Sequence, residues 1–212
     1  MKDFPVFPTS HGAASLILKE IPYRQEAYIR IQSTHEPELL LEECVSFCTA
    51  CGAERIYASG DEFLENYPLF TSIYQMKGCL FLSEEEIPGM FPVTEATVSR
   101  WRELYNQKMQ RVDNAATLEK RDEEVILSSG GAYFIHDAGT LLGIGWLAGD
   151  ELKALASFKQ GAGERVCKAI QSLIPQQTIT LEVASTNEKA RRLYEKLGFL
   201  KTAELSKWYR VK

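Results

Sequence analysis

The spacing of hydrophobic residues near the C-terminus changes from that of a strand to that of a helix. Residues 178–183 alternate apolar and β-branched side chains, which predicts a strand. Beyond residue 187 the apolar residues recur at spacings of three and four, which predicts an amphipathic helix. Its apolar stripe consists of Ala190, Leu193, Tyr194 and Leu197. Asn187 is the expected N-cap of this helix, and Gly198 lies where a left-handed C-cap is expected.

Strand and helix patterns continue upstream as far as residue 90. A glycine-containing turn at residues 159–163 separates a strand from a helix whose inward positions begin at Val166. Asp137-Ala-Gly139 and Ala148-Gly-Asp150 are hairpin turn signals between strands. The other predicted elements are a strand over 90–94, helical stretches over 95–112 and 113–129, strands over 132–136, 140–147 and 151–158, and two final strands from residue 199 to residue 211.

The first 83 residues contain a weaker pattern that resembles half of the later one. It predicts strands over 27–32 and 55–58 and helices over 36–53 and 63–77. The eight residues from Ile73 to Leu80 parallel those from Leu193 to Leu200 at a constant offset of 120, although chance similarity remains an alternative. We therefore expect a degenerate α/β half-domain at 1–83, an acidic linker at 84–89 and a larger domain at 90–212.

Two motifs together resemble a known superfamily. The C-terminal motif is Asn187-x-x-Ala190-x-x-Leu193-Tyr194-x-x-Leu197-Gly198-Phe199, and Gly161-x-Gly163 precedes it. The combination resembles the acyl-coenzyme A binding end of the GNAT amine N-acetyltransferases. Over residues 90–212 this resemblance implies an α/β (α+β) fold, with a mixed, mostly antiparallel central sheet and flanking helices, preceded by the smaller α/β half-domain.

The resemblance also implies how acetyl-coenzyme A, the co-substrate, would bind. Glycines at a helix N-terminus let backbone N–H groups approach a pyrophosphate that the helix dipole favours. The family carries Arg or Gln where this chain has Phe158, and Gln160 is a possible substitute. The residues implied to bind the cofactor are Leu155, Ala156 and Ser157, through strand amides to the thioester carbonyl, together with Gln160, Gly161, Ala162, Gly163, Glu164, Asn187 and Ala190.

Two side chains are implied as catalytic groups. Tyr194 matches the family tyrosine that protonates the departing thiolate, and a phenol is protonated at neutral pH. Glu182, in the middle of an apolar strand, is the expected base, with a pKa raised by partial burial. The structural alternatives are a core aromatic for Tyr194 and a solvated strand face for Glu182. Asp150 and Glu151 are rival bases.

The implied activity is transfer of an acetyl group to the primary amine of a small molecule or peptide by direct attack. The alternative is a catalytically silent GNAT-like module that binds a ligand or regulates, which Phe158 and the degenerate half-domain favour. Substrate choice in this family depends on the first helices and final strands. The aromatic residues there are Trp101, Tyr105, Trp208 and Tyr209, which could equally be core residues or dimer contacts.

Composition narrows the class of protein further. The chain has 212 residues, 45% hydrophobic and 25% charged, with a formal net charge of -5, which is ordinary globular composition. The absence of a basic run argues against nucleic-acid binding. No apolar run approaches the ~20 residues of a membrane span, and the N-terminus has no signal-peptide pattern, so we expect a cytoplasmic protein. The oligomeric state stays open, a homodimer included.

The five cysteines include one Cys-x-x-Cys, formed by Cys48 and Cys51. This spacing suits redox chemistry or zinc. However, Cys44, Cys48 and Cys51 lie at helical spacing among apolar residues, and a buried free cysteine behaves as a small apolar side chain. No second Cys-x-x-Cys accompanies them, so we expect no metal site.

Overall fold

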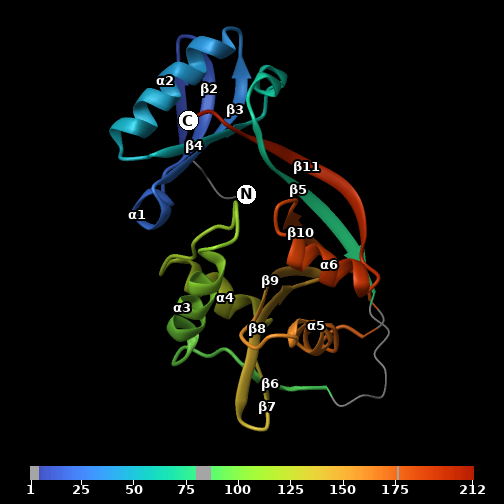
Figure 1. Cartoon of the computed structure of the whole chain (residues 1–212). Coiled ribbons are helices and arrows are strands. Elements are labelled where there is room, and N and C mark those ends of the chain that lie inside the picture. Colours follow the sequence, from blue (N-terminus) through green and yellow to red (C-terminus); the bar gives the residue numbers. More distant parts are fainter. Residues whose placement is uncertain (1–4, 80–86, 176) are drawn as a thin grey trace. The chain divides into compact units, whose positions relative to one another are not determined.

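The computed structural model describes residues 5–79, 87–175 and 177–212 (Figure 1). The chain forms two compact units. The first consists of Met1–Ile73 with Glu204–Lys212, and the second of Tyr74–Ala203. Two long strands, β5 (Leu69–Gly78) and β11 (Leu200–Arg210), contribute residues to both units.

The first unit is a mixed sheet in which the strands lie in the order β1-β2-β3-β4-β11-β5. β1 and β2 form an antiparallel hairpin, whereas β3 and β4 are parallel and are joined by α2. Its remaining elements are β1 (Val6–Thr9), β2 (Gly12–Ile17), α1 (Ile21–Arg24), β3 (Glu26–Thr34), α2 (Pro37–Ala50), β4 (Arg55–Ser59) and the 3-10 helix η1 (Glu62–Asn66).

The two faces of this sheet differ. On one face, α2 packs its buried residues, Leu40, Leu41, Cys44 and Cys48, against Ala14, Ala27 and Ile29 of the strands. On the other face Tyr28, Tyr57 and Trp208 form an aromatic cluster. Burial raises the pKa of the Cys44 thiol to about 11 and that of Cys48 to about 12, so both are protonated core residues at neutral pH.

The second unit is built on a mostly antiparallel sheet. From β5 its strands lie in the order β5-β10-β9-β8-β7-β6, and the β9–β10 pair is parallel. Its elements are β6 (Gly89–Pro92), α3 (Val98–Met109), α4 (Asp122–Ser129), β7 (Ala132–Asp137), β8 (Thr140–Ala148), β9 (Glu151–Ser157), α5 (Gly163–Gln171), β10 (Ile179–Ala184) and α6 (Glu188–Lys196).

Both predicted hairpins are confirmed. The first turn pairs Asp137 with Thr140, with positive φ at Ala138 and Gly139 as a two-residue hairpin requires. The second pairs Ala148 with Glu151. The tight turns fix which residues of β7, β8 and β9 face each side of the sheet.

The helices of the second unit pack on opposite faces of its sheet (Figure 1). α5 and α6 share a core with Ile135, Leu147 and Leu181, and α3 and α4 cover Ile144 and Ala156. α5 can approach β8 closely because two β8 residues lack a Cβ. A Cβ on Gly143 would lie 2.8 Å from Val166 Cγ2, and one on Gly145 would lie 2.4 Å from Ile170 Cγ1.

The aromatic residues considered for substrate choice are all buried. Trp101 is fully buried, and its indole N–H donates to Tyr133 O at 3.1 Å. Tyr105 stacks on the Trp101 ring. Trp208 and Tyr209 belong to the two clusters of the first unit. These side chains stabilise the fold, which is the core alternative raised from the sequence.

Three predictions about secondary structure were wrong. Residues 63–77 form η1 and then β5, so the segment beginning at Ile73 is a strand and does not parallel the helix at Leu193. In the predicted helix 113–129 only Asp122–Ser129 is helical. The two expected C-terminal strands are the single strand β11. In residues 69–78 strand pairing outweighed the helical spacing of the apolar residues.

The predicted domain boundaries do not coincide with the two compact units, because β5 and β11 run through both. Of the expected linker at 84–89, residues 84–86 lie outside the described residues, and Gly89 begins β6. No helix in the described ranges has the length and apolar character needed to cross a lipid bilayer.

Candidate functional site

The parallel strands β9 and β10 separate soon after they meet. Thr180 registers with Glu151 and Leu181 with Leu152, and the pairing ends there although both strands continue. β9 continues to Ser157 along β8 instead. A gap therefore opens between the C-terminal halves of β9 and β10.

An extra residue in β9 marks the point of separation. Trp146 registers with Ala154 but the next residue, Leu147, registers with Leu152, so Lys153 is the unpaired residue of a β-bulge. Leu152 packs in the core with α5, whereas Ala154 packs in the core with α3. The bulge therefore exchanges the faces that β9 side chains occupy.

The register of β9 decides which amides face the gap. Phe158 N–H donates to Leu142 O of β8 at 2.8 Å. Hydrogen-bonding groups of an antiparallel strand alternate in direction, so the Ala156 amide also faces β8, and the amides of Leu155 and Ser157 face β10. Two of the three expected strand donors thus point into the gap, and the Ala156 amide does not.

The turn after β9 leads directly into the N-terminus of α5. Gly161 adopts φ +80°, a left-handed conformation that favours glycine, and a Cβ there would meet no described atom within 4 Å. At Gly163 a Cβ would lie 3.0 Å from Leu193 Cδ2, so this glycine lets α6 pack closely on α5. Ala162, the N-cap, makes no side-chain capping bond, so no side chain of the cap accepts from the first amides of the helix.

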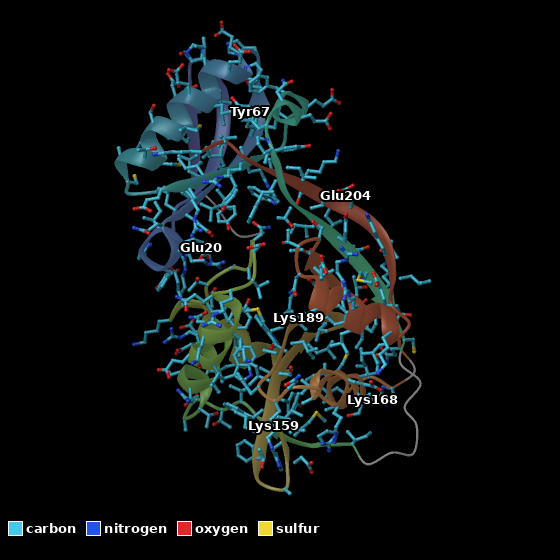
Figure 2. All side chains as sticks on the ribbon, in the orientation of Figure 1. Glu20, Tyr67, Lys159, Lys168, Lys189 and Glu204 are labelled. Atoms are coloured by element: carbon cyan, nitrogen blue, oxygen red, sulfur yellow. The ribbon has the colours of Figure 1, made fainter. Side chains whose placement is uncertain are left out.

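Phe158 does not belong to this loop surface. Its ring packs in the core with α3 and lies under the Lys108 ammonium, 5.3 Å from the ring centroid. The Phe158 ring therefore lies on the face of the sheet that α3 covers and not on the face that α5 covers. The polar residues of the turn are Lys159 and Gln160. Figure 2 shows Lys159 at this turn, with Lys168 on α5 and Lys189 on α6.

A charged cluster lies at the first turn of α5. The Glu164 carboxylate accepts from Lys196 Nζ of α6 at 2.7 Å, and it pairs with Lys168 Nζ at 3.1 Å. Hydrogen bonds from Lys196 and Lys168 lower the pKa of Glu164. Two ammonium groups thus share one carboxylate beside the helix N-terminus, which leaves a net positive charge there.

The ends of α6 are as the sequence predicted. Asn187 Oδ1 accepts from Ala190 N–H at 3.3 Å, which confirms the N-cap. At the other end Gly198 adopts φ +85°. Gly198 N–H donates to Glu195 O and Phe199 N–H to Tyr194 O, which is the Schellman arrangement.

Tyr194 has both a structural and a chemical character. Its ring packs on Phe199 with centroids 5.6 Å apart, the hydrophobic contact that accompanies a Schellman cap. Burial, with a smaller contribution from Cys167, raises the pKa of Tyr194 above its ordinary value. The phenol is therefore protonated at neutral pH, so it carries a proton that it can donate toward a departing thiolate.

Glu182 lies at the gap but is not buried as expected. It directly follows Leu181, the last β10 residue in register with β9, and alternation places it on the face opposite Leu181 and Val183. The side chain is exposed, which corrects the expected partial burial. The rivals lie at the closed end of the strand pair: Asp150 is in the exposed hairpin turn, and Glu151 forms an ion pair with Lys153.

Sequence reasoning missed the bulge at Lys153 and the pairing of Lys168 and Lys196 with Glu164. The Lys168 pair was visible as an i,i+4 spacing from Glu164. The Lys196 contact joins two helices and has no local signal. The signal for the bulge is that Leu152 and Leu155, three positions apart, pack in the same core, whereas a regular strand places such positions on opposite faces.

The family model described as "FR47-like protein" matches residues 152–210. This range runs from the start of the β9 gap through the α5 turn and α6 to the end of β11. No curated protein sequence matches the chain.

Solved structures share the fold at low sequence identity. A functionally unknown conserved protein from Staphylococcus epidermidis matches with a TM-score of 0.61 at 11% identity, over 98% of this chain and 93% of its own. A GCN5-related N-acetyltransferase from Sphaerobacter thermophilus matches with a TM-score of 0.56 at 10% identity, over 93% and 75% of the two chains. One from Anabaena variabilis gives 0.63 at 11% identity, over 94% and 59%.

At these identities the structural likeness shows the fold, and it extends over the first 73 residues as well as the C-terminal part. The family match independently covers the strand gap, the α5 turn and α6. The chain therefore has the fold of these GCN5-related N-acetyltransferase structures, and its residues 152–210 match the FR47-like family model.

Proposed function

We propose that the chain is an acetyl-coenzyme A-dependent N-acetyltransferase that acetylates a primary amine of a small molecule or peptide. The observation that carries the proposal is the gap between β9 and β10, followed in the chain by the α5 N-terminus, which has no side-chain cap. A gap with outward-facing amides can bind a thioester carbonyl, and a cationic helix N-terminus can bind a pyrophosphate.

The proposed chemistry is a direct transfer. The neutral amine attacks the thioester carbonyl carbon, a C–N bond forms, and the C–S bond breaks. The amides of Leu155 and Ser157 stabilise the carbonyl oxygen while it carries negative charge. Glu182 accepts the amine's proton, directly or through water, because it is the carboxylate next to the gap. Tyr194 returns a proton to the departing thiolate.

We propose that the degenerate half at residues 1–83 binds no coenzyme and serves the fold or the shape of the substrate site. β3 and β4 stay paired over five successive positions, from Glu26↔Arg55 to Arg30↔Ser59, so they leave no gap. At the start of α2 the Glu36 carboxylate contacts His11 Nδ1 at 2.5 Å, where a phosphate would otherwise lie.

A second candidate is a silent module that binds a ligand without turnover. Two observations favour it. Glu182 is exposed and so lacks the burial that would make it a strong base at neutral pH. The packing of Gly163 against α6 and of the Tyr194 ring against Phe199 explains both residues without any catalytic role. Binding of acetyl-coenzyme A without transfer to any amine would support this candidate.

The first test is acetyl-coenzyme A binding by calorimetry, with two matched variants. Gly161→Asp places a carboxylate at the α5 turn, and Gly149→Asp makes the same change at a glycine of similar φ with equally open surroundings. We expect micromolar binding that Gly161→Asp abolishes and Gly149→Asp retains. No binding by the folded wild type, or equal loss in both variants, would contradict the cofactor site.

The catalytic roles are tested once an accepted amine is known. Tyr194→Phe keeps the ring contact with Phe199 and removes the proton donor, so kcat should fall by roughly 10²-fold at unchanged acetyl-coenzyme A affinity. Glu182→Gln should lower kcat and flatten its rise with pH. A Glu182→Gln enzyme with full kcat across the pH range would rule out Glu182 as the base.

A further inference from the structure

A pocket of the first unit lies apart from the proposed transfer site, between α2 and η1. Its volume is about 660 Å³, within the range of small-molecule sites. The polar and aromatic residues of its lining are Glu38, Glu42, Phe63, Asn66 and Tyr67. Figure 2 labels Tyr67 beside η1.

The two carboxylates of the pocket repel each other. Glu38 and Glu42 are four residues apart on α2, a spacing at which like charges destabilise a helix. Both side chains are exposed, and in the described ranges neither forms an ion pair with a lysine or arginine. Val211 lines the pocket, but the ammonium of the adjacent Lys212 donates to Thr49 Oγ1 at 2.9 Å.

The remaining walls suit the same kind of ligand. The rings of Phe63 and Tyr67 are in edge contact, with centroids 5.8 Å apart, and both are partly buried. Asn66 Nδ2 donates to Phe63 O at 2.9 Å, so one of its two N–H donors is used, and its oxygen can accept. The pocket thus combines aromatic faces with acceptors and negative charge, and its lining contains no cationic side chain.

We propose that this pocket binds a small organic cation, an ammonium group on a short apolar stem. The ammonium would pair with Glu38 and Glu42 and relieve their repulsion, and the stem would lie against Phe63 and Tyr67, whose π-faces also attract a cation. The same carboxylates exclude anions. The proposal rests on the first unit alone and does not depend on acetyl transfer.

The test is calorimetric titration of the full chain with hexylammonium, and with hexanoate as the probe of opposite charge and equal stem. We expect saturable binding of hexylammonium and none of hexanoate. Glu38→Gln/Glu42→Gln should weaken hexylammonium binding by about tenfold, and Tyr67→Leu, which keeps an apolar wall, by about threefold.

The matched control is Glu95→Gln/Glu124→Gln, which removes the same charge at two exposed positions of the second unit. It should leave the affinity unchanged. The proposal is overturned if hexylammonium does not saturate, if hexanoate binds equally well, or if the control weakens binding as much as the pocket variant does. An unchanged affinity in Glu38→Gln/Glu42→Gln would also overturn it, because the amine would then bind elsewhere on the chain.

Discussion

The chain contains two strand–helix–strand motifs with the same connectivity, β3–α2–β4 in the first unit and β9–α5–β10 in the second. They differ in how far their two strands stay paired. β3 and β4 remain paired along five positions, whereas β9 and β10 part after two. α2 begins at Pro37 after the N-cap Glu36, and α5 begins at Gly163, two residues after Gly161. The same connectivity therefore does not determine whether the two strands separate or which residues begin the helix.

What distinguishes the units chemically is a few backbone details. A bulge at Lys153 accompanies the strand gap of the second unit, and the conformation of Gly161 keeps space open in front of its helix. In the first unit the corresponding space holds a carboxylate and the His11 imidazole. A ligand site therefore depends on where pairing stops and on what caps the helix, and the fold alone does not decide either.

The largest expected effect concerns whether residues 1–73 can fold without the C-terminal residues of β11. A chain ending at Ala203 lacks the residues that place Trp208 and Tyr209 in its two cores. We expect residues 1–73 to lose cooperative folding, because losing one buried aromatic typically costs about 3–5 kcal/mol. Hydrogen exchange followed by mass spectrometry would locate the loss.

The control for this truncation is Lys207→Ala in the full chain, which removes an exposed ion pair with Glu65 and leaves both aromatic residues. It should leave exchange in residues 1–73 unchanged. Native-like protection of residues 1–73 in the truncated chain would show that this part folds without β11, as the predicted boundaries 1–83 and 90–212 require.

An intermediate effect, on the free energy of unfolding, is expected at the contact between α5 and β8. α2 packs on Ala14 and Ala27, but α5 packs on Gly143 and Gly145. Gly145→Ala would place its Cβ 2.4 Å from Ile170 Cγ1, so we expect unfolding free energy to fall by about 1–3 kcal/mol. Urea denaturation measures this change.

A double-mutant cycle separates this clash from a general effect of the substitution. Ile170→Ala removes the atoms that the new Cβ would meet, so Gly145→Ala should cost less in the Ile170→Ala background than in the wild type. Equal costs in both backgrounds would mean that the close approach of α5 to β8 is not what requires glycine.

The smallest effect concerns the charge at the start of α5. Glu164→Gln removes the carboxylate from the helix N-terminus and releases Lys168 and Lys196, so acetyl-coenzyme A should bind about threefold more tightly. Glu188→Gln is the control, because Glu188 is in the first turn of α6 and pairs with Arg192. Weaker binding by Glu164→Gln would mean that Glu164 positions the lysines for the ligand.

The same residue predicts a pH effect of known sign. Because the pKa of Glu164 is lowered in the folded chain, its contribution to stability is present above the ordinary value of about 4.3 and is lost as pH falls through the lowered pKa. Acid unfolding of Glu164→Gln should therefore show a shallower loss of stability below that pH than the wild type.

Local patterns predicted the second unit well and the first poorly. The α6 caps and the hairpin turns follow from side chains within a few residues, so Asn187, Gly198 and Gly139 could be interpreted directly. The strand at residues 69–78 could not, because its pairing partners lie far away in sequence and strand propensity is weak compared with pairing.

The candidate site was predictable in its residue types and not in its geometry. The motif located the α5 turn and Tyr194, but the exposure of Glu182 depends on which face of β10 it occupies and on what covers that face. The direction of the Ala156 amide depends on its register with Ile144. Neither quantity has a signal within the sequence of the strand itself.

The extra residue in β9 also changes how substitutions along this strand should be interpreted. Before Lys153 even-numbered side chains face α5, and after it odd-numbered ones do, as Leu152 and Leu155 show. A scan for tolerated polar residues would therefore record two alternating series that are out of phase by one position. The position where the phase changes marks the opening of the strand gap, so sequence variants alone could locate it.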